Sequence, residues 1–504
     1  MAVERIGQRL FFNTVATGAN TAWAIVVAFV TLPLLLHGLG SEGFGLWVLL
    51  QTFSAVTGWL SLADLGVGIA LTRAVAAAVA RQDTVAERRT TLSGLALLGG
   101  IGAVAALLLA TIGTLVFPWL FSVPVGFTGQ LRIATLLVAG GVLFDLMTEG
   151  VEAALEGLQR VDLSRGLDAV RRGGVAVAAS AAALTTHQLA AVAAAALAAS
   201  VLAAGVAVAA LLRRLPTGEG GVSSTEIRAL VKYAKPVSVL NASGVLHRTM
   251  DRLIVGAVLG PQSVTLVEIA TQLQNGVLAV LSSTSYAVAP AASWLHARGD
   301  RDRLRRLFER GTRYSLVITL PLAAVVACLA LPIIHVWVGA TYDAAALLTV
   351  LGMVYVMEAA MTSVPAACVQ GTGHAGALVR PALLAVFVNV GLSIVLVRQV
   401  GVAGAFIGTL AGTALQVGPY LRVGLSAAGS TVRSFVTVCV LPALPVVLAA
   451  MLSCLIVLWL PGLGDPLKIV IGAIGAATLG GAVAMITAVS WTELRSLALV
   501  SEAA

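Results

Sequence analysis

Residues 189–212 read LAAVAAAALAASVLAAGVAVAALL and contain no charged side chain. An α-helix rises about 1.5 Å per residue and the hydrocarbon core of a bilayer is about 30 Å thick, so about 20 apolar residues suffice to cross it. The chain repeats such segments: 59% of its residues are hydrophobic, 11% are charged, and the mean hydropathy is +0.98. No soluble fold needs so apolar a composition. We therefore predict an all-α polytopic membrane protein.

The apolar segments predict about fourteen transmembrane helices. Very short turns join two pairs of these segments, 168–186 with 189–212 and 379–397 with 402–421. Each pair is counted as two helices, because a single helix of their combined length would be too long for one crossing. The other predicted spans lie near 10–36, 44–72, 90–117, 131–155, 234–257, 264–292, 314–338, 344–368, 435–460 and 466–490.

The distribution of Lys and Arg predicts the orientation, because these residues accumulate in cytoplasmic loops. With the amino terminus inside, the inner connections hold most of the basic residues, among them Arg171, Arg172, Arg213, Arg214 and the arginines from Arg298 to Arg313. The outer connections hold only Arg132, Arg398 and Lys468. We therefore expect both termini to be cytoplasmic. This topology accounts for the net charge of +8 without nucleic-acid binding.

Three weak internal matches predict two repeated halves. LGSEGFGLW at 39–47 aligns with LGPQSVTLV at 259–267, ARQDTVAERR at 80–89 with ARGDRDRLRR at 297–306, and Gly157 with Gly371. Their order and similar offsets indicate a parallel pseudo-repeat, as in many transporters. We expect six-helix lobes at 1–215 and 234–425 around a central cavity, a cytoplasmic linker at 216–233, and two additional transmembrane helices at 435–490.

Several segments together resemble a known family. LGSEGFGLW is followed by LSLADLGVGIALTRAVA, LEGLQRVDLS, RTMDRLIVGAVLG and VNVGLSIVLVRQVGVAGAFIGTLAG, in this order along nearly the whole chain. The set is similar to the polysaccharide biosynthesis and export flippases for O-antigen and exopolysaccharide, in the multidrug/oligosaccharidyl-lipid/polysaccharide exporter superfamily. The resemblance implies a bacterial inner-membrane flippase that moves an undecaprenyl-diphosphate-linked oligosaccharide from the inner to the outer leaflet by alternating access. It also implies membrane lipids and other polysaccharide-assembly proteins as partners.

A cluster of polar residues in the predicted span 234–257 suits an anionic cargo. Arg248, Asp251 and Arg252 share a helix face because residues three or four apart do so, and the planar guanidinium group suits a diphosphate. The alternatives are a structural Arg248–Asp251 pair and an Arg252 that extends to the interface; for Asn241, interhelical hydrogen bonding is the alternative. The candidate contacts to diphosphate or sugar are Asn241, His247, Arg248 and Arg252.

Carboxylates inside the spans are candidates for coupling transport to an H⁺ or Na⁺ gradient. Asp145, Glu149, Glu152 and Glu156 recur at helical spacing and form one acidic stripe, whose last member reaches the cytoplasmic interface. Alternatively, the carboxylates neutralise cavity arginines or cap loosened helix segments. The other embedded candidates are Asp64, Asp251 and Glu358. We predict no metal site, cofactor or catalytic residue.

Three other functions compete with this interpretation. A multidrug exporter of the same superfamily usually has twelve helices, whereas two additional spans are predicted here. A lipid II flippase of the same helix count would be expected to carry several cationic residues in its first two helices, and this chain has none between Arg9 and Arg73. A polysaccharide polymerase or glycosyltransferase would need acidic residues on a large outer loop, but the longest predicted outer loop, 118–131, has none.

Overall fold

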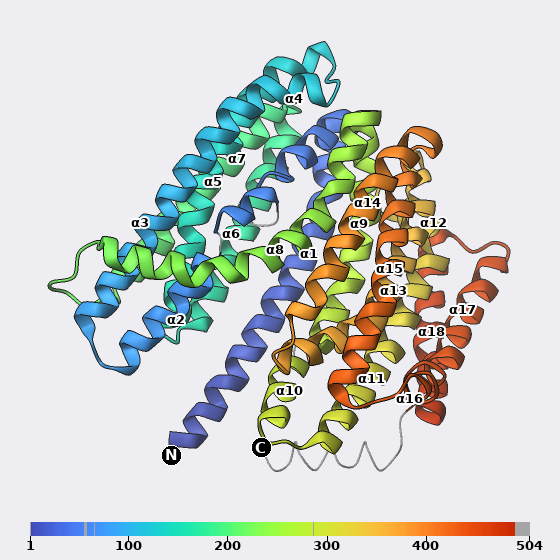
Figure 1. The fold of residues 1–504 in the computed structure, drawn as a ribbon. Helices are drawn as coiled ribbons and strands as arrows, with labels where there is room; N and C mark the ends of the chain where they lie inside the picture. The colour runs from blue at the N-terminus through green and yellow to red at the C-terminus, as the bar shows by residue number, and fades with distance from the viewer. Residues whose placement is uncertain (1, 55–57, 65, 286, 489–504) are drawn as a thin grey trace. The chain divides into compact units, whose positions relative to one another are not determined.

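The computed structural model describes residues 2–54, 58–64, 66–285 and 287–488, and among these it describes the side chains except at 2–17, 63, 64, 235–244 and 246–248. All regular elements in this part of the chain are helical, as predicted (Figure 1). The contacts between residues divide the chain into two compact units, Met1–Thr265 and Leu266–Ala504. The lobe limits expected from the repeat, 1–215 and 234–425, stay a prediction.

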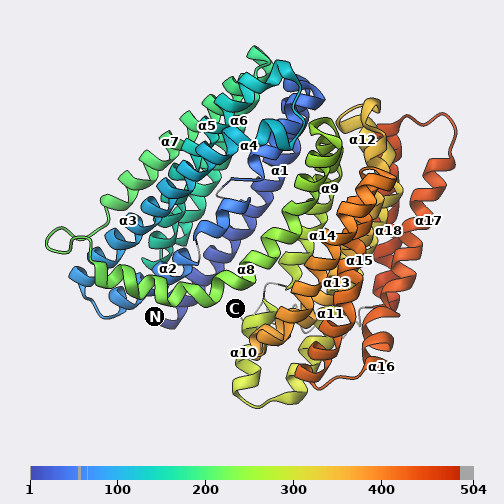
Figure 2. The same cartoon turned by 45° about the horizontal axis from the view of Figure 1, so that its top comes forward.

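The first unit is a helical bundle in which α3, α5 and α7 run side by side (Figures 1 and 2). Gly157 at the end of α5 packs against Val75 of α2, where a side chain would collide with the neighbouring helix. The hydroxyl of Thr72 donates a hydrogen bond to the carbonyl of Ala153, at 2.9 Å. The elements are α1 (Ala2–Gln51), η1 (Trp59–Asp64), α2 (Val67–Ala80), α3 (Thr84–Leu108), the π-helical turn η2 (Leu109–Gly113), α4 (Thr114–Leu120), α5 (Val125–Gly157), α6 (Val161–Thr186), α7 (Leu189–Leu212) and α8 (Ser224–Leu259).

The predicted span 44–72 is not one helix, which corrects the sequence-based expectation. Helix α1 has a kink at Gly40, whose φ is 71°, and ends at Gln51; α2 begins only at Val67. Between them the amide of Trp59 donates to the carbonyl of Thr52, at 2.8 Å, and the space beside that carbonyl is too small for a side chain at Gly58. Gly66, with a φ of 75°, caps α2 in a conformation that favours glycine.

The second unit packs α11, α13, α14 and α15 together and adds α17 and α18 at its side (Figure 2). Gly404, Gly408 and Gly412, four residues apart on α15, lie against the backbone or Cβ of α14 with no room for a side chain, as in other close membrane helix pairs. The elements are α9 (Pro261–Ser285), α10 (Val288–Ala297), α11 (Arg301–Cys328), α12 (Ala330–Trp337), η3 (Ala340–Tyr342), α13 (Ala344–Gly371), α14 (Gly376–Val400), α15 (Ala403–Ala428), α16 (Val432–Ser434), the π-helical turn η4 (Phe435–Val440), α17 (Ala443–Trp459) and α18 (Asp465–Thr487).

Ten helices of the described residues are long and apolar enough to cross a membrane. The remaining predicted spans correspond to α2, which has 14 residues, to α6 and α8, which carry several charges, and to the glycine-rich α15. The count of fourteen therefore stays a prediction. Large apolar side chains are exposed along these helices, including Trp119 (80%) and Trp459 (86%) at helix ends, where tryptophan is enriched at membrane interfaces. A multi-pass membrane protein follows.

A polar clasp ties α18 to α12 in the second unit. We define the clasp as His335, Asp343 and Asp465. The His335 ring contacts Asp465 through Nδ1 at 3.0 Å and Asp343 through Nε2 at 2.5 Å. Both ring nitrogens donate only when the imidazole is protonated. The hydrogen bond to Asp465, with the charge of Asp343, raises the pKa of His335 above its ordinary 6.5.

The clasp should make stability depend on pH. A histidine whose pKa is raised by folding contributes stability that is fully present below pH 6.5 and is lost as the pH rises through the raised pKa. Thermal unfolding of the purified chain should show this loss, and His335→Gln should abolish the dependence in that window. His37→Gln serves as the control. An unchanged pH profile in His335→Gln would contradict the assignment.

Candidate functional site

A network of charged side chains is buried between α5 and α6 in the first unit. Arg171 is 5% exposed, and its Nη2 lies 2.7 Å from Oδ1 of Asp168, one turn earlier on α6. Its Nη1 lies 3.7 Å from Oδ1 of Asp145 on α5. The charge of Arg171 also interacts with Glu149 and Glu152. The structure therefore brings three members of the predicted acidic stripe together around one arginine.

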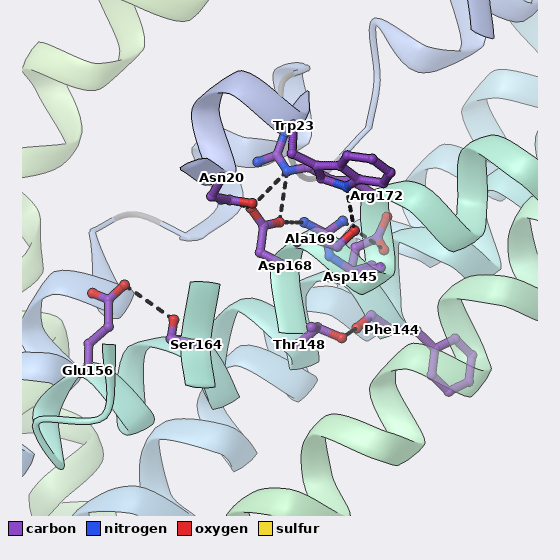
Figure 3. A network of polar contacts seen from close by, with 11 residues as sticks. Asn20, Trp23, Phe144, Asp145, Thr148, Glu156, Ser164, Asp168, Ala169 and Arg172 are labelled. Carbon is purple, nitrogen blue, oxygen red and sulfur yellow. Dashed lines mark hydrogen bonds and ion pairs between the residues drawn. The ribbon is translucent and has the colours of Figure 1, made fainter. Parts of the chain in front are cut away.

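Helix α1 supports the network from the other side (Figure 3). The amide of Asn20 donates to Asp168 at 2.9 Å, and the indole of Trp23 donates to the carbonyl of Ala169 at 3.0 Å. Arg172 adds a second guanidinium group, with its Nε 2.8 Å from Oδ2 of Asp168. These contacts fix Asp168, and through it Arg171, in one orientation.

The fourth member of the stripe has a different partner. Glu156, near the end of α5, lies 3.1 Å from Arg165 and accepts a hydrogen bond from Ser164 at 3.4 Å. Both charged side chains are partly exposed, at 28% and 33%. This pair closes the end of the network where the helices reach the surface.

Measured from the far end of α6, the network falls within one hydrocarbon thickness. Arg171 is 15 residues before Thr186, the last residue of α6, a distance of about 22 Å along the helix, and the core is about 30 Å thick. Four carboxylates, Asp145, Glu149, Glu152 and Asp168, face two guanidinium groups, Arg171 and Arg172. If all were ionised, the site would hold an excess of two negative charges, which is costly at this depth.

A small cavity of about 40 Å³ adjoins the network. Its polar lining includes Asp145, Gln51 and Ser200, and Ser200 also hydrogen-bonds to Asp145. Oδ1 of Asp145 and Oε1 of Glu152 are buried without a hydrogen-bond partner among the described residues. A cavity of this volume with several polar lining atoms has room for a water molecule or a small monovalent cation.

The remaining predicted site residues lie on other helices. Asp251 and Arg252 are partly buried on α8, which packs mainly against α1, α2, α3 and η1. Glu358 lies on α13 in the second unit, with Oε2 buried and lacking a hydrogen-bond partner in the described part of the chain. The side chains of Asp64, Asn241, His247 and Arg248 lie outside the described residues.

Sequence reasoning missed the arginine at the centre of the network. Arg171 and Arg172 were assigned to an inner connection, but both lie inside α6, ten or more residues after its start. The signal that could have found them is the spacing of Asp168, Arg171 and Arg172, which places an acid and two bases on neighbouring turns directly before an apolar run. The orientation rule counts every basic residue near the end of a predicted span as part of a loop, and both arginines lie near the start of the predicted span 168–186.

Removing the central arginine should destabilise the first unit. Arg171→Ala leaves Asp145 without a cation, and breaking a buried pair in this way costs about 3–5 kcal/mol. Arg172→Gln removes a side chain that is 35% exposed and leaves Asp168 paired with Arg171, so it should cost less. Denaturation of the two purified variants measures this difference, and adding Asp145→Asn to Arg171→Ala should restore part of the loss. Equal losses in the two single variants would contradict a central role for Arg171.

Comparison with known proteins gives one family match and several structural matches. A family model described as "polysaccharide biosynthesis protein" matches residues 168–347. No curated protein matches the chain by sequence. The lipid II flippase MurJ in an inward closed conformation superposes with a TM-score of 0.74 at 12% identity, covering 94% of this chain and 99% of MurJ.

Two multidrug transporters also share the fold. An inward-facing MATE family transporter of the MOP superfamily gives a TM-score of 0.65 at 14% identity, covering 80% of this chain and 94% of its own. A variant of the Vibrio cholerae MATE transporter VcmN gives 0.60 at 16% identity, covering 86% and 99%. The chain therefore has the fold of the MOP superfamily, and its resemblance to the polysaccharide biosynthesis family is confirmed by the family model over residues 168–347.

Proposed function

We propose that the chain is a flippase that moves an undecaprenyl-diphosphate-linked oligosaccharide from the inner to the outer leaflet of a bacterial inner membrane, with both termini cytoplasmic. The observation that carries this proposal is the polysaccharide biosynthesis match, which begins at Asp168 within the buried network. The fold of a lipid II flippase, which covers 94% of the chain, supports a lipid-linked cargo. The expected partners are membrane lipids and other polysaccharide-assembly proteins.

The cargo would be recognised by the polar cluster of α8. Helix α8 is continuous from Ser224 to Leu259, so Arg248 and Arg252 are one turn apart on the same face. Two guanidinium groups at this spacing suit the adjacent phosphates of a diphosphate. His247 and Asn241 are proposed to contact phosphate or sugar, and Asp251 to orient the arginines.

The buried network would couple transport to an ion gradient. Its four carboxylates outnumber its two arginines, so binding of H⁺ or Na⁺ relieves the excess charge, and release restores it. The cavity beside Asp145 supports this role because it offers room for a cation or water. Asp64 and Glu358 are proposed as further cavity carboxylates.

A cation-coupled multidrug exporter is the second candidate, favoured by the MATE matches. Those structures cover 80% and 86% of the chain, less than the 94% covered by the lipid II flippase. An enzyme that polymerises or transfers sugars is disfavoured, since the structural matches are transporters and a flippase.

Deleting the gene should strand a lipid-linked glycan on the cytoplasmic leaflet and remove surface glycan. Complementation with Arg248→Ala should lower surface glycan by about tenfold or more, because a charge-assisted hydrogen bond is worth about 1.5–3 kcal/mol. Arg213→Ala, an exposed arginine at the end of α7, is the matched control and should complement fully. Membrane levels of each variant are measured by immunoblot. Normal surface glycan in the deletion strain would remove the flippase assignment.

Transport in sealed vesicles should respond to an imposed proton or sodium gradient. Asp145→Asn and Glu149→Gln should weaken this response, because each removes a carboxylate of the network. Asp162→Asn is the control: Asp162 is exposed and pairs with Arg160 at 3.0 Å, at the start of α6. Indifference of the unmodified chain to both gradients would show that transport is not ion-coupled.

A further inference from the structure

A second cavity, of about 650 Å³, lies in the second unit between the end of α15 and the start of α16. It is separate from the buried network and from the proposed cargo contacts on α8. Arg422, Ser426 and Thr431 line one part of it, and Leu425, Val432 and Phe435 line another. The cavity thus combines hydrogen-bond donors with an apolar wall.

The position of Arg422 along α15 places the polar part at a membrane boundary. Helix α15 begins at Ala403, directly after the short turn from α14, which is itself a candidate span. Arg422 is 19 residues further on, about 28 Å along the axis. A hydrocarbon core is about 30 Å thick, so the guanidinium group lies where lipid headgroups are found.

Several polar side chains at the cavity have hydrogen-bond donors available for a ligand. Arg422 and the neighbouring Arg433 are exposed, and neither forms an ion pair with any carboxylate that the structure describes. Oγ1 of Thr431 accepts from the amide of Ser434 at 3.1 Å, which leaves its own hydrogen to donate. The nearby carboxylate of Glu309 already accepts hydrogen bonds from Ser430 and Ser434, at 2.8 and 2.7 Å.

The apolar wall distinguishes the site from a surface for free anions. Leu425 and Phe435 are 7% and 4% exposed and belong to the core of the second unit, whereas Val432 is 67% exposed at the rim. A free phosphate ion gains nothing from contact with apolar side chains, whereas an acyl chain buries apolar surface against them. The two parts together match a lipid that carries a negative headgroup and a hydrocarbon tail.

We propose that this cavity binds an anionic phospholipid from the adjacent leaflet. The phosphate accepts hydrogen bonds from Arg422, Ser426 and Thr431, and an acyl chain lies against Leu425, Val432 and Phe435. Arg433 adds positive charge that favours a net negative headgroup over a zwitterionic one. This site does not depend on the proposed flippase function, since lipid binding is measured without transport.

Native mass spectrometry of the full chain in detergent tests the proposal, with phosphatidylglycerol and phosphatidylcholine of identical acyl chains as probes. The unmodified chain should retain phosphatidylglycerol about fivefold more strongly, since a basic residue near the surface contributes about 1 kcal/mol. Arg422→Gln should remove this preference. Arg213→Gln, an exposed arginine of the first unit, should keep it. Ser426→Ala, which alters an exposed hydroxyl, should reduce retention and provides a second variant if Arg422→Gln does not fold.

Three outcomes would overturn the site. Undiminished preference in Arg422→Gln, together with undiminished retention in Ser426→Ala, would show that the lipid binds elsewhere. An equal loss in Arg213→Gln would indicate general attraction to a basic surface. Displacement of phosphatidylglycerol by millimolar inorganic phosphate, with no effect of acyl-chain length on retention, would identify a free-anion site.

Discussion

Arg171 and Asp168, an ion pair 2.7 Å apart on α6, link that helix to its neighbours α5 and α1. A guanidinium group at hydrocarbon depth must have a partner, so α6 presents residue 171 to the carboxylates of α5. Asn20 of α1 then binds the same Asp168, at 2.9 Å. Apolar helix surfaces in lipid give little directional preference, and these polar contacts therefore set the rotation of α1, α5 and α6 relative to one another.

Much of the helical architecture could be predicted from the sequence. The apolar runs that predict spans at 131–155 and 189–212 correspond to α5 and α7. They could be predicted because the length of an apolar run is a local property of the sequence, and a bilayer requires a fixed minimum length. The interruption between Gln51 and Val67 could not be predicted, since it depends on how Gly58 and Thr52 meet in three dimensions. An apolar run is compatible with either a continuous or a broken helix.

The candidate site was predictable only in part. Helical spacing placed Asp145, Glu149 and Glu152 on one face, and the structure brings all three to Arg171. The bases that the sequence indicates as candidate cargo contacts, Arg248 and Arg252, lie on α8. The cationic partner of the three carboxylates lies on α6, because packing of neighbouring helices, which no spacing rule encodes, decides which charges meet.

The close contact of α14 and α15 has a mechanical consequence. With Gly404, Gly408 and Gly412 against the facing helix, neither helix can slide or roll past the other without a backbone collision, and packed surfaces of this kind compress very little. The two helices therefore move as one rigid body. Any bending of the second unit must occur in the segments outside this helix pair.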